Sequence, residues 1–167
     1  MSLVKNETRG RKSRAAEIAG WWERLRGLPG GRWLFGRLLG LAIPYTGTVR
    51  PLIQEIRPGY ARVALRDRRR VRNHLRSIHA IALANVGEFT GGIAMTATLP
   101  PDVRSILLKL EVEFLKKARG TVVAECHCTV PVVAGTMDHQ VQTTIRDAAG
   151  DEVARVTATW RLSPLQG

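Results

Sequence analysis

The stretch that decides the fold is NHLRSIHAIALANVGEFTGG, residues 73–92. A polar approach segment leads into an apolar segment of small residues that contains one carboxylate, Glu88. At about 100° per residue, one side of the expected helix holds Glu88 and mostly small residues, and the other side forms a core face. The Glu88 side contains Ile81, Ala84, Asn85, Gly91, Gly92 and Met95, and the core side contains Ala82, Leu83, Val86, Phe89 and Ile93. Because a buried carboxylate is costly unless it is paired or used, the pattern indicates a site around Glu88.

Segments on both sides of this helix have the alternation of β-strands. Two helices are expected near the N-terminus, from Ser13 to Leu28 and around residues 34–42, separated by Pro29-Gly30-Gly31. The expected order then continues with strands 48–56 and 60–66, the helix 77–95, and strands 106–116, 121–131, 136–147 and 152–162. Pro51 within the first strand indicates a sheet edge or a bulge. Strands before and after one long helix predict an α+β fold.

The succession of Asn73, His79-Ala80 and Glu88 resembles the hotdog-fold superfamily, in particular acyl-CoA thioesterases related to the phenylacetate-pathway and 4-hydroxybenzoyl-CoA enzymes. Those enzymes have an Asn or Gln, then a His-Gly-Gly-type turn into a long central helix, and an Asp or Glu inside that helix. The phrases PGGRWLF (29–35) and FLKKARG (114–120) resemble a bacterial subgroup of the same superfamily. The resemblance covers about residues 20–163 and implies an antiparallel β-sheet wrapped around a long central helix.

The expected organisation is a disordered basic tail at residues 1–13, an N-terminal helical extension at 14–45 and the hotdog domain at 46–165. A chain of 167 residues is long enough for one domain with a substantial core. No run reaches the roughly 18 apolar residues of a membrane span, and no cleavable signal follows the basic N-terminus. We therefore expect a cytoplasmic protein.

The resemblance also implies roles for individual residues. Glu88 attacks the thioester or activates water, the Ala80 N–H polarises the thioester carbonyl, and Asn73 orients the water or the carboxylate. A helix N-terminus suits the second role because its free amides favour developing negative charge. The remaining substrate-binding candidates are His79, which braces the loop, and Ile81, Gly91 and Gly92 on the helix. No cofactor is expected other than coenzyme A as part of the substrate.

The net charge of +12 is concentrated in three basic blocks. The blocks are Lys5, Arg9, Arg11, Lys12 and Arg14; Arg66, Arg68, Arg69, Arg70, Arg72 and Arg76; and Lys116, Lys117 and Arg119. Such blocks attract polyanions in general, and Arg suits bidentate phosphate contacts. We assign Lys116, Lys117 and Arg119 to the nucleotide phosphates of an acyl-CoA.

Three alternatives stay open. Ala80-Ile81 stands where the resembling enzymes have two glycines, so a protein that binds acyl-CoA or a lipid-like ligand without turnover is one of them. A polyanion-binding module is weaker, because an aromatic content of 5% makes nucleic acid an unfavourable partner. For Glu88 itself, the alternative is an ion pair with an arginine of residues 66–76, within one chain or across a subunit boundary.

The expected partners are an acyl-CoA-type small molecule and further copies of the chain. Sites in the resembling superfamily lie between subunits, which implies a homodimer or a dimer of dimers. Pairing of sheet edges would also protect them from other contacts. Peripheral contact of the basic, Trp-bearing N-terminal helices with a membrane surface is a further possibility.

The two cysteines, Cys126 and Cys128, are expected on one face of a strand, where disulfide geometry is poor. His127 would point to the other face, so the pattern favours buried free thiols and no metal site.

Overall fold

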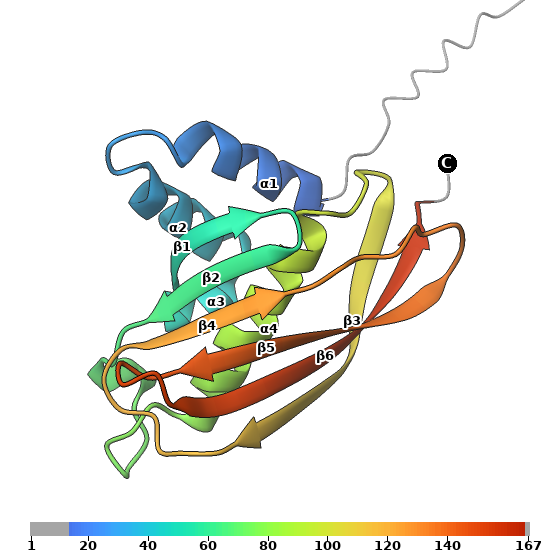
Figure 1. The fold of residues 1–167 in the computed structure, drawn as a ribbon. Coiled ribbons are helices and arrows are strands. Elements are labelled where there is room, and N and C mark those ends of the chain that lie inside the picture. Colours follow the sequence, from blue (N-terminus) through green and yellow to red (C-terminus); the bar gives the residue numbers. More distant parts are fainter. Residues whose placement is uncertain (1–13, 166–167) are drawn as a thin grey trace, which may run out of the picture.

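One antiparallel sheet of six strands, in the order β1-β2-β4-β5-β6-β3, organises the computed structural model, which describes residues 14–165 (Figure 1). The strands are β1 (Leu52–Arg57), β2 (Tyr60–Leu65), β3 (Val103–Phe114), β4 (Val122–His127), β5 (Met137–Arg146) and β6 (Glu152–Pro164). The helices are α1 (Arg14–Leu25), α2 (Gly31–Ala42), α3 (Pro44–Val49) and α4 (Ala80–Thr96), with a short 3-10 turn η1 (Arg69–Val71). The basic tail expected over residues 1–13, with Ser13 as a helix cap, lies outside the described residues.

Helix α4 lies across one face of the sheet and packs against β2, β4, β5 and β6 (Figure 1). Its apolar residues Leu83, Val86 and Phe89 are buried. Gly87 faces β6 so closely that a Cβ there would lie 2.4 Å from Val156 Cγ2. The absence of side chains at such positions lets the helix approach the sheet, so the glycines compensate in packing for their low helix propensity.

The N-terminal helices α1 and α2 cover the β1 end of the molecule (Figure 1). Trp22 of α1 is buried, and its indole N–H donates to the Ile56 carbonyl of β1 at 3.1 Å. Its ring meets Phe35 of α2 edge to face, with 5.3 Å between ring centroids. Aromatic burial of this kind anchors both helices to the domain. No helix within residues 14–165 is long and apolar enough to cross a lipid bilayer.

The strand expected over residues 48–56 was wrong at its start. Residues 44–49 form α3, and β1 begins only at Leu52. Pro44 at the first turn suits a helix start, and Gly47 packs onto Gly40 of α2 so tightly that a Cβ at Gly47 would lie 2.4 Å from the Gly40 carbonyl oxygen. The edge or bulge that Pro51 indicates is confirmed, because β1 is an edge strand whose register shifts between Ile53 and Glu55.

The other edge of the sheet is β3, and several of its apolar side chains are exposed. Leu110 and Phe114 stand opposite Ala158 and Ala154 of β6, so they share the face on which α4 packs. Both alanines are buried, whereas Leu110 and Phe114 are exposed. This edge is an apolar surface without a partner in the protomer.

The two cysteines are free, as expected; Cys126 is buried in β4, and Cys128, just after β4, is half-buried.

Candidate active site

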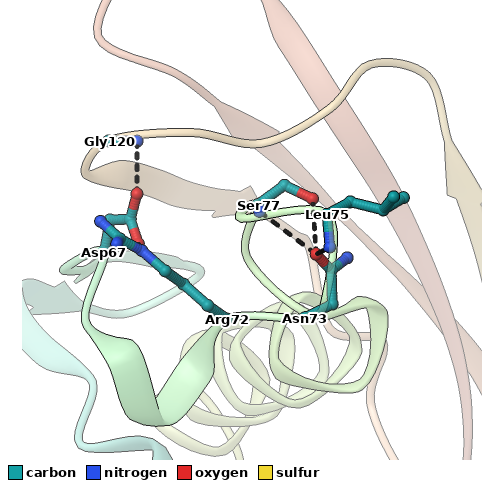
Figure 2. Close-up of polar contacts among 6 residues, drawn as sticks. All are labelled: Asp67, Arg72, Asn73, Leu75, Ser77 and Gly120. Carbon is teal, nitrogen blue, oxygen red and sulfur yellow. Dashed lines mark hydrogen bonds and ion pairs between the residues drawn. The ribbon is translucent and has the colours of Figure 1, made fainter.

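The loop that leads into α4 is held closed by Asn73 (Figure 2). Its Oδ1 accepts hydrogen bonds from the N–H of Leu75 at 2.9 Å, from the N–H of Ser77 at 3.2 Å and from the hydroxyl of Ser77 at 3.1 Å. The Asn73 N–H also donates to the Ser77 carbonyl at 2.9 Å. The side-chain oxygen is therefore used by the loop. The predicted role of Asn73 in orienting water stays a prediction, and it would fall to the amide nitrogen.

The carboxylate of Asp67 connects this approach loop to the segment around Gly120, which is distant in the sequence. It accepts hydrogen bonds from Arg72 Nε at 2.5 Å and from the Gly120 N–H at 3.0 Å (Figure 2). The hydrogen bond from Arg72 holds the pKa of Asp67 below its ordinary value. The Ile78 N–H donates to the Ala118 carbonyl at 2.8 Å, so the two segments are joined twice. These contacts fix where α4 begins.

His79 is the N-cap of α4. Its backbone is extended, and its ring Nδ1 accepts a hydrogen bond from the Ile81 N–H at 3.1 Å. This agrees with the expectation that His79 braces the loop. The N–H groups of Ala82 and Leu83 donate to the His79 carbonyl. The Ala80 N–H, in contrast, has no acceptor among the described residues, so it is free to bind a negative charge at the helix N-terminus.

A hollow of about 750 Å³ opens beside this first turn of α4. It lies between α3, the segment 70–72, and the side chains of His79 and Ile81. Arg50, Arg70 and Arg72 also line it, which makes it electropositive. Arg72 is paired with Asp67, whereas Arg50 and Arg70 form no ion pair with another described residue. Ile81 is exposed at its rim, where its side chain narrows the approach to the helix end.

Glu88 lies two turns further along α4 and is half-buried. Burial away from water raises the pKa of its carboxyl above the ordinary value, and no described group forms a hydrogen bond or ion pair with it. The structural alternative, an ion pair with an arginine of residues 66–76, is therefore absent within residues 14–165 of one protomer. A desolvated carboxylate without a partner is a typical general base.

The spacing of Glu88 and Ala80 limits how they can work together. Eight residues separate them on α4, which corresponds to about 12 Å along the helix axis. One thioester carbonyl cannot lie within about 3 Å of the Ala80 N–H and also meet a water held by Glu88 of the same chain. If both groups act on one substrate, they come from two different chains.

The other predicted substrate-binding residues are dispersed. A Cβ at Gly91 would lie 3.0 Å from Thr143 Oγ1, and one at Gly92 would lie 3.3 Å from the Trp160 ring, so both glycines face the sheet. Lys116 Nζ is paired with Asp147 at 2.9 Å and with Asp151 at 2.5 Å. Lys117 and Arg119 are exposed beside that cluster. The structure thus places Lys117 and Arg119 on the segment that is bonded to the approach loop through Ala118, whereas Lys116 is held by the two aspartates.

Two features of this region were not selected from the sequence. Asn85 donates from Nδ2 to the Thr46 hydroxyl of α3 at 3.2 Å, while its Oδ1 is buried without a hydrogen-bond partner in the described part of the chain. Its position on the Glu88 side of the helical wheel was the available signal. Arg50 and Tyr45 line the hollow from α3 and its C-terminal end, and no local pattern connects that segment with α4.

Comparison with protein families gives one match. The family described as Domain of unknown function (DUF4442) matches residues 31–162. The chain belongs to this family. The DUF4442 region runs from the start of α2 into β6 and contains the approach loop, the hollow and Glu88. A comparison with curated proteins gave no significant match.

Solved structures share the fold of this DUF4442 protein. The protein APC5556 is 28% identical, with a TM-score of 0.77 over 91% of this chain and 99% of its own. PA5026 from Pseudomonas aeruginosa, a protein of unknown function named as a probable thioesterase, is 20% identical, with a TM-score of 0.70 over 82% of this chain and 97% of its own. The protein smu.793 from Streptococcus mutans, solved with acetyl-CoA bound, is 17% identical, with a TM-score of 0.59 over 69% of this chain and 90% of its own.

These similarities confirm the expected hotdog fold for the DUF4442 chain. The narrower resemblance to phenylacetate-pathway and 4-hydroxybenzoyl-CoA thioesterases stays a prediction.

Proposed function

We propose that this protein is an acyl-CoA thioesterase in which Glu88 is the general base. The observation that carries the proposal is a half-buried carboxylate with a raised pKa and no partner in its own protomer. The fold, shared with a probable thioesterase and with a protein that binds acetyl-CoA, supports the same reaction class. Hydrolysis of a thioester needs no cofactor beyond the coenzyme A of the substrate.

The proposed reaction uses two groups of helix α4, each contributed by a different chain. The Glu88 carboxylate takes a proton from water, and the water oxygen forms a bond to the thioester carbonyl carbon. The Ala80 N–H binds the carbonyl oxygen as it becomes negative. When the tetrahedral intermediate collapses, the carbon–sulfur bond breaks, and the coenzyme A thiolate receives the proton that Glu88 had taken. The products are a carboxylic acid and free coenzyme A.

The site is proposed to form between two protomers. The distance of about 12 Å along α4 between Ala80 and Glu88 favours a contribution from each chain. The exposed apolar edge at Leu110 and Phe114 of β3 is a suitable dimer surface, because pairing there covers both unpaired backbone groups and apolar side chains. A dimer, or a dimer of dimers, would then bring Glu88 of one chain to the hollow of the other.

The hollow beside α4 is proposed to receive the polar end of the substrate. Arg50 and Arg70 there have no carboxylate partner among the described residues, so they are available for phosphate. Lys117 and Arg119, the nucleotide-binding residues expected from the sequence, remain alternatives for the same phosphates. Lys116 is the weaker candidate because Asp147 and Asp151 already neutralise it.

The test is release of free thiol from short, long and aromatic acyl-CoAs by wild type and Glu88→Gln. Loss of a general base is expected to lower kcat about 10²–10⁴-fold while the fold and the assembly persist. Glu55→Gln is the matched control, because Glu55 is exposed on β1 and its loss should leave turnover unchanged.

Turnover that is equal in wild type and Glu88→Gln would contradict the role of Glu88. Binding of acyl-CoA by both proteins without turnover would instead identify a ligand-binding hotdog protein, in which Ala80 and Ile81 have replaced the two glycines of the resembling enzymes.

A further inference from the structure

Helix α2 presents an apolar stripe to solvent. Trp33 is 66% exposed, Leu34 42% and Leu41 79%. At about 100° per residue, these three residues and Arg37 fall within a single arc of about 100°. The opposite side of α2 is buried through Phe35 and Leu39. The stripe is therefore the outer face of an anchored helix, and its apolar side chains cover nothing in the protomer.

The segment of sequence that contains this stripe is basic. Residues 24–54 contain five arginines and neither an aspartate nor a glutamate. Arg37 lies within the stripe and forms no ion pair with another described residue, whereas Arg32 lies on the other side of α2, in a hollow lined also by Glu23 and Glu55. The Arg37 guanidinium lies over the Trp33 ring, 5.4 Å from its centroid, so charge and apolar surface are presented together.

The position of α2 leaves this face accessible. The helix packs against β1, at the opposite edge of the sheet from β3, as Figure 1 shows for the blue and yellow elements. Pairing of two protomers through β3 would not cover it. An exposed apolar stripe that contains Trp33 and the unpaired Arg37 is complementary to the interface of an anionic lipid bilayer.

We propose that the outer face of α2 is a peripheral docking surface for anionic membranes. Trp33, Leu34 and Leu41 enter the boundary between headgroups and acyl chains. Arg37 contacts lipid phosphates at that boundary. The helix lies in the plane of the membrane surface and does not cross it.

Co-sedimentation of the purified full chain with vesicles tests this surface. Wild type is expected to bind phosphatidylglycerol-containing vesicles and to stay in solution with pure phosphatidylcholine. The double variant Trp33→Ser/Leu41→Ser should bind at least tenfold more weakly, because it loses two inserted apolar side chains. Arg37→Gln should bind about fivefold more weakly at low salt, whereas Arg32→Gln, on the other side of α2, should lose less.

Val132→Ser is the matched control, because Val132 is exposed on the loop between β4 and β5, away from α2. It should bind as wild type does. Failure of wild type to bind anionic vesicles, or equal binding by Trp33→Ser/Leu41→Ser, would overturn the proposal. A change in assembly mass in that variant, with vesicle binding retained, would assign the face to a protein interface. The assay needs no substrate, so its result is independent of the thioesterase proposal.

Discussion

Glu88 is energetically unusual because it is the one charged residue in a largely apolar helix. Its carboxylate is partly removed from water, and no described group of the same protomer compensates for that loss. Most half-buried carboxylates are paired or hydrogen-bonded, because desolvation of an ion costs several times more than desolvation of an amide. Such a carboxylate is explained either by a role in catalysis or by an ion pair with a group across a subunit boundary. The free energy of unfolding of a Glu88 variant can distinguish these two explanations.

The Glu88→Gln variant is expected to be more stable than wild type at pH 7. Because burial raises the folded-state pKa above the unfolded-state value, the native protein binds more protons, and its stability falls as pH rises through that range. Gln has no charge to desolvate. The advantage of Gln should therefore disappear below about pH 4, where Glu88 is protonated in both states. Urea unfolding at both pH values checks this. A less stable Gln variant at pH 7 would indicate an ion pair from a neighbouring chain.

Asn73 offers a second prediction, which separates its two polar atoms. Asn73→Ala removes an oxygen that accepts three hydrogen bonds, so we expect a loss of about 1–3 kcal/mol in the free energy of unfolding. Asn73→Asp keeps the acceptor and should restore most of that loss. If the amide nitrogen orients water, Asn73→Asp will be folded and slow in thiol release. Equal stability of Asn73→Ala and wild type would contradict the structural role.

At the scale of elements, sequence periodicity predicted what depends on local pattern. The long apolar segment of residues 77–95 is present as α4, shortened at its start because residues 73–77 form a closed loop and His79 takes the cap. The strands after it agree within a few residues, except that β4 ends at His127, before the expected Pro131. Helix α3 was missed because its β-branched residues favour a strand locally. The Gly40–Gly47 contact that stabilises it is tertiary.

The candidate site also contains some residues that a local sequence pattern predicts and others that only the tertiary structure reveals. The segment from His79 to Glu88 was found because one helix carries its residues at fixed spacing. Arg50, by contrast, is brought to the hollow by α3, and Lys116 is paired by a hairpin more than thirty residues further along. Neither contact follows from a local sequence pattern. The sequence therefore could not show that Arg50 has no ion-pair partner among the described residues whereas Lys116 has two.

Two Gly→Ala substitutions, one in α4 and one in α2 for comparison, are expected to change the free energy of unfolding in opposite directions. Together they test the packing of α4. Gly87→Ala improves helix propensity, but its methyl group would lie 2.4 Å from Val156, so we expect a net loss of about 1–2 kcal/mol. Gly36→Ala in α2 meets nothing within 4 Å and should gain up to about 1 kcal/mol. Thermal or urea unfolding of both variants gives the comparison. Stabilisation by Gly87→Ala would mean that the helix lies further from β6.

For the molecule as a whole, the β3 edge is the feature that a single chain leaves incomplete. Leu110 and Phe114 lie on the helix side of the sheet and are nevertheless exposed. The two proposed reactive groups, the Ala80 N–H and the Glu88 carboxylate, lie about 12 Å apart on one helix, so they are proposed to act from two different chains. Since the β3 edge is the proposed contact between those chains, assembly and activity are both expected to depend on it.

Leu110→Arg/Phe114→Arg should convert the assembly to monomers, because two buried charges would oppose pairing of the edges. Light scattering after size-exclusion chromatography measures the mass, and thiol release should fall with it although Glu88 is intact. Val132→Arg, a similar change on the β4–β5 loop, should alter neither. An unchanged mass in the double variant would place the subunit contact elsewhere on the molecule.

The unpaired amide at the start of α4 has a spectroscopic consequence. The N–H groups of Ile81, Ala82 and Leu83 are bonded to His79, through its ring or its carbonyl, whereas the Ala80 N–H has no acceptor among the described residues. In deuterated solvent, Ala80 should exchange its proton sooner than these three neighbours. A ligand that presents an oxygen to the helix end will slow exchange at Ala80 first. The first turn of α4 therefore reports occupancy of the hollow by NMR, whether or not the ligand is ever turned over.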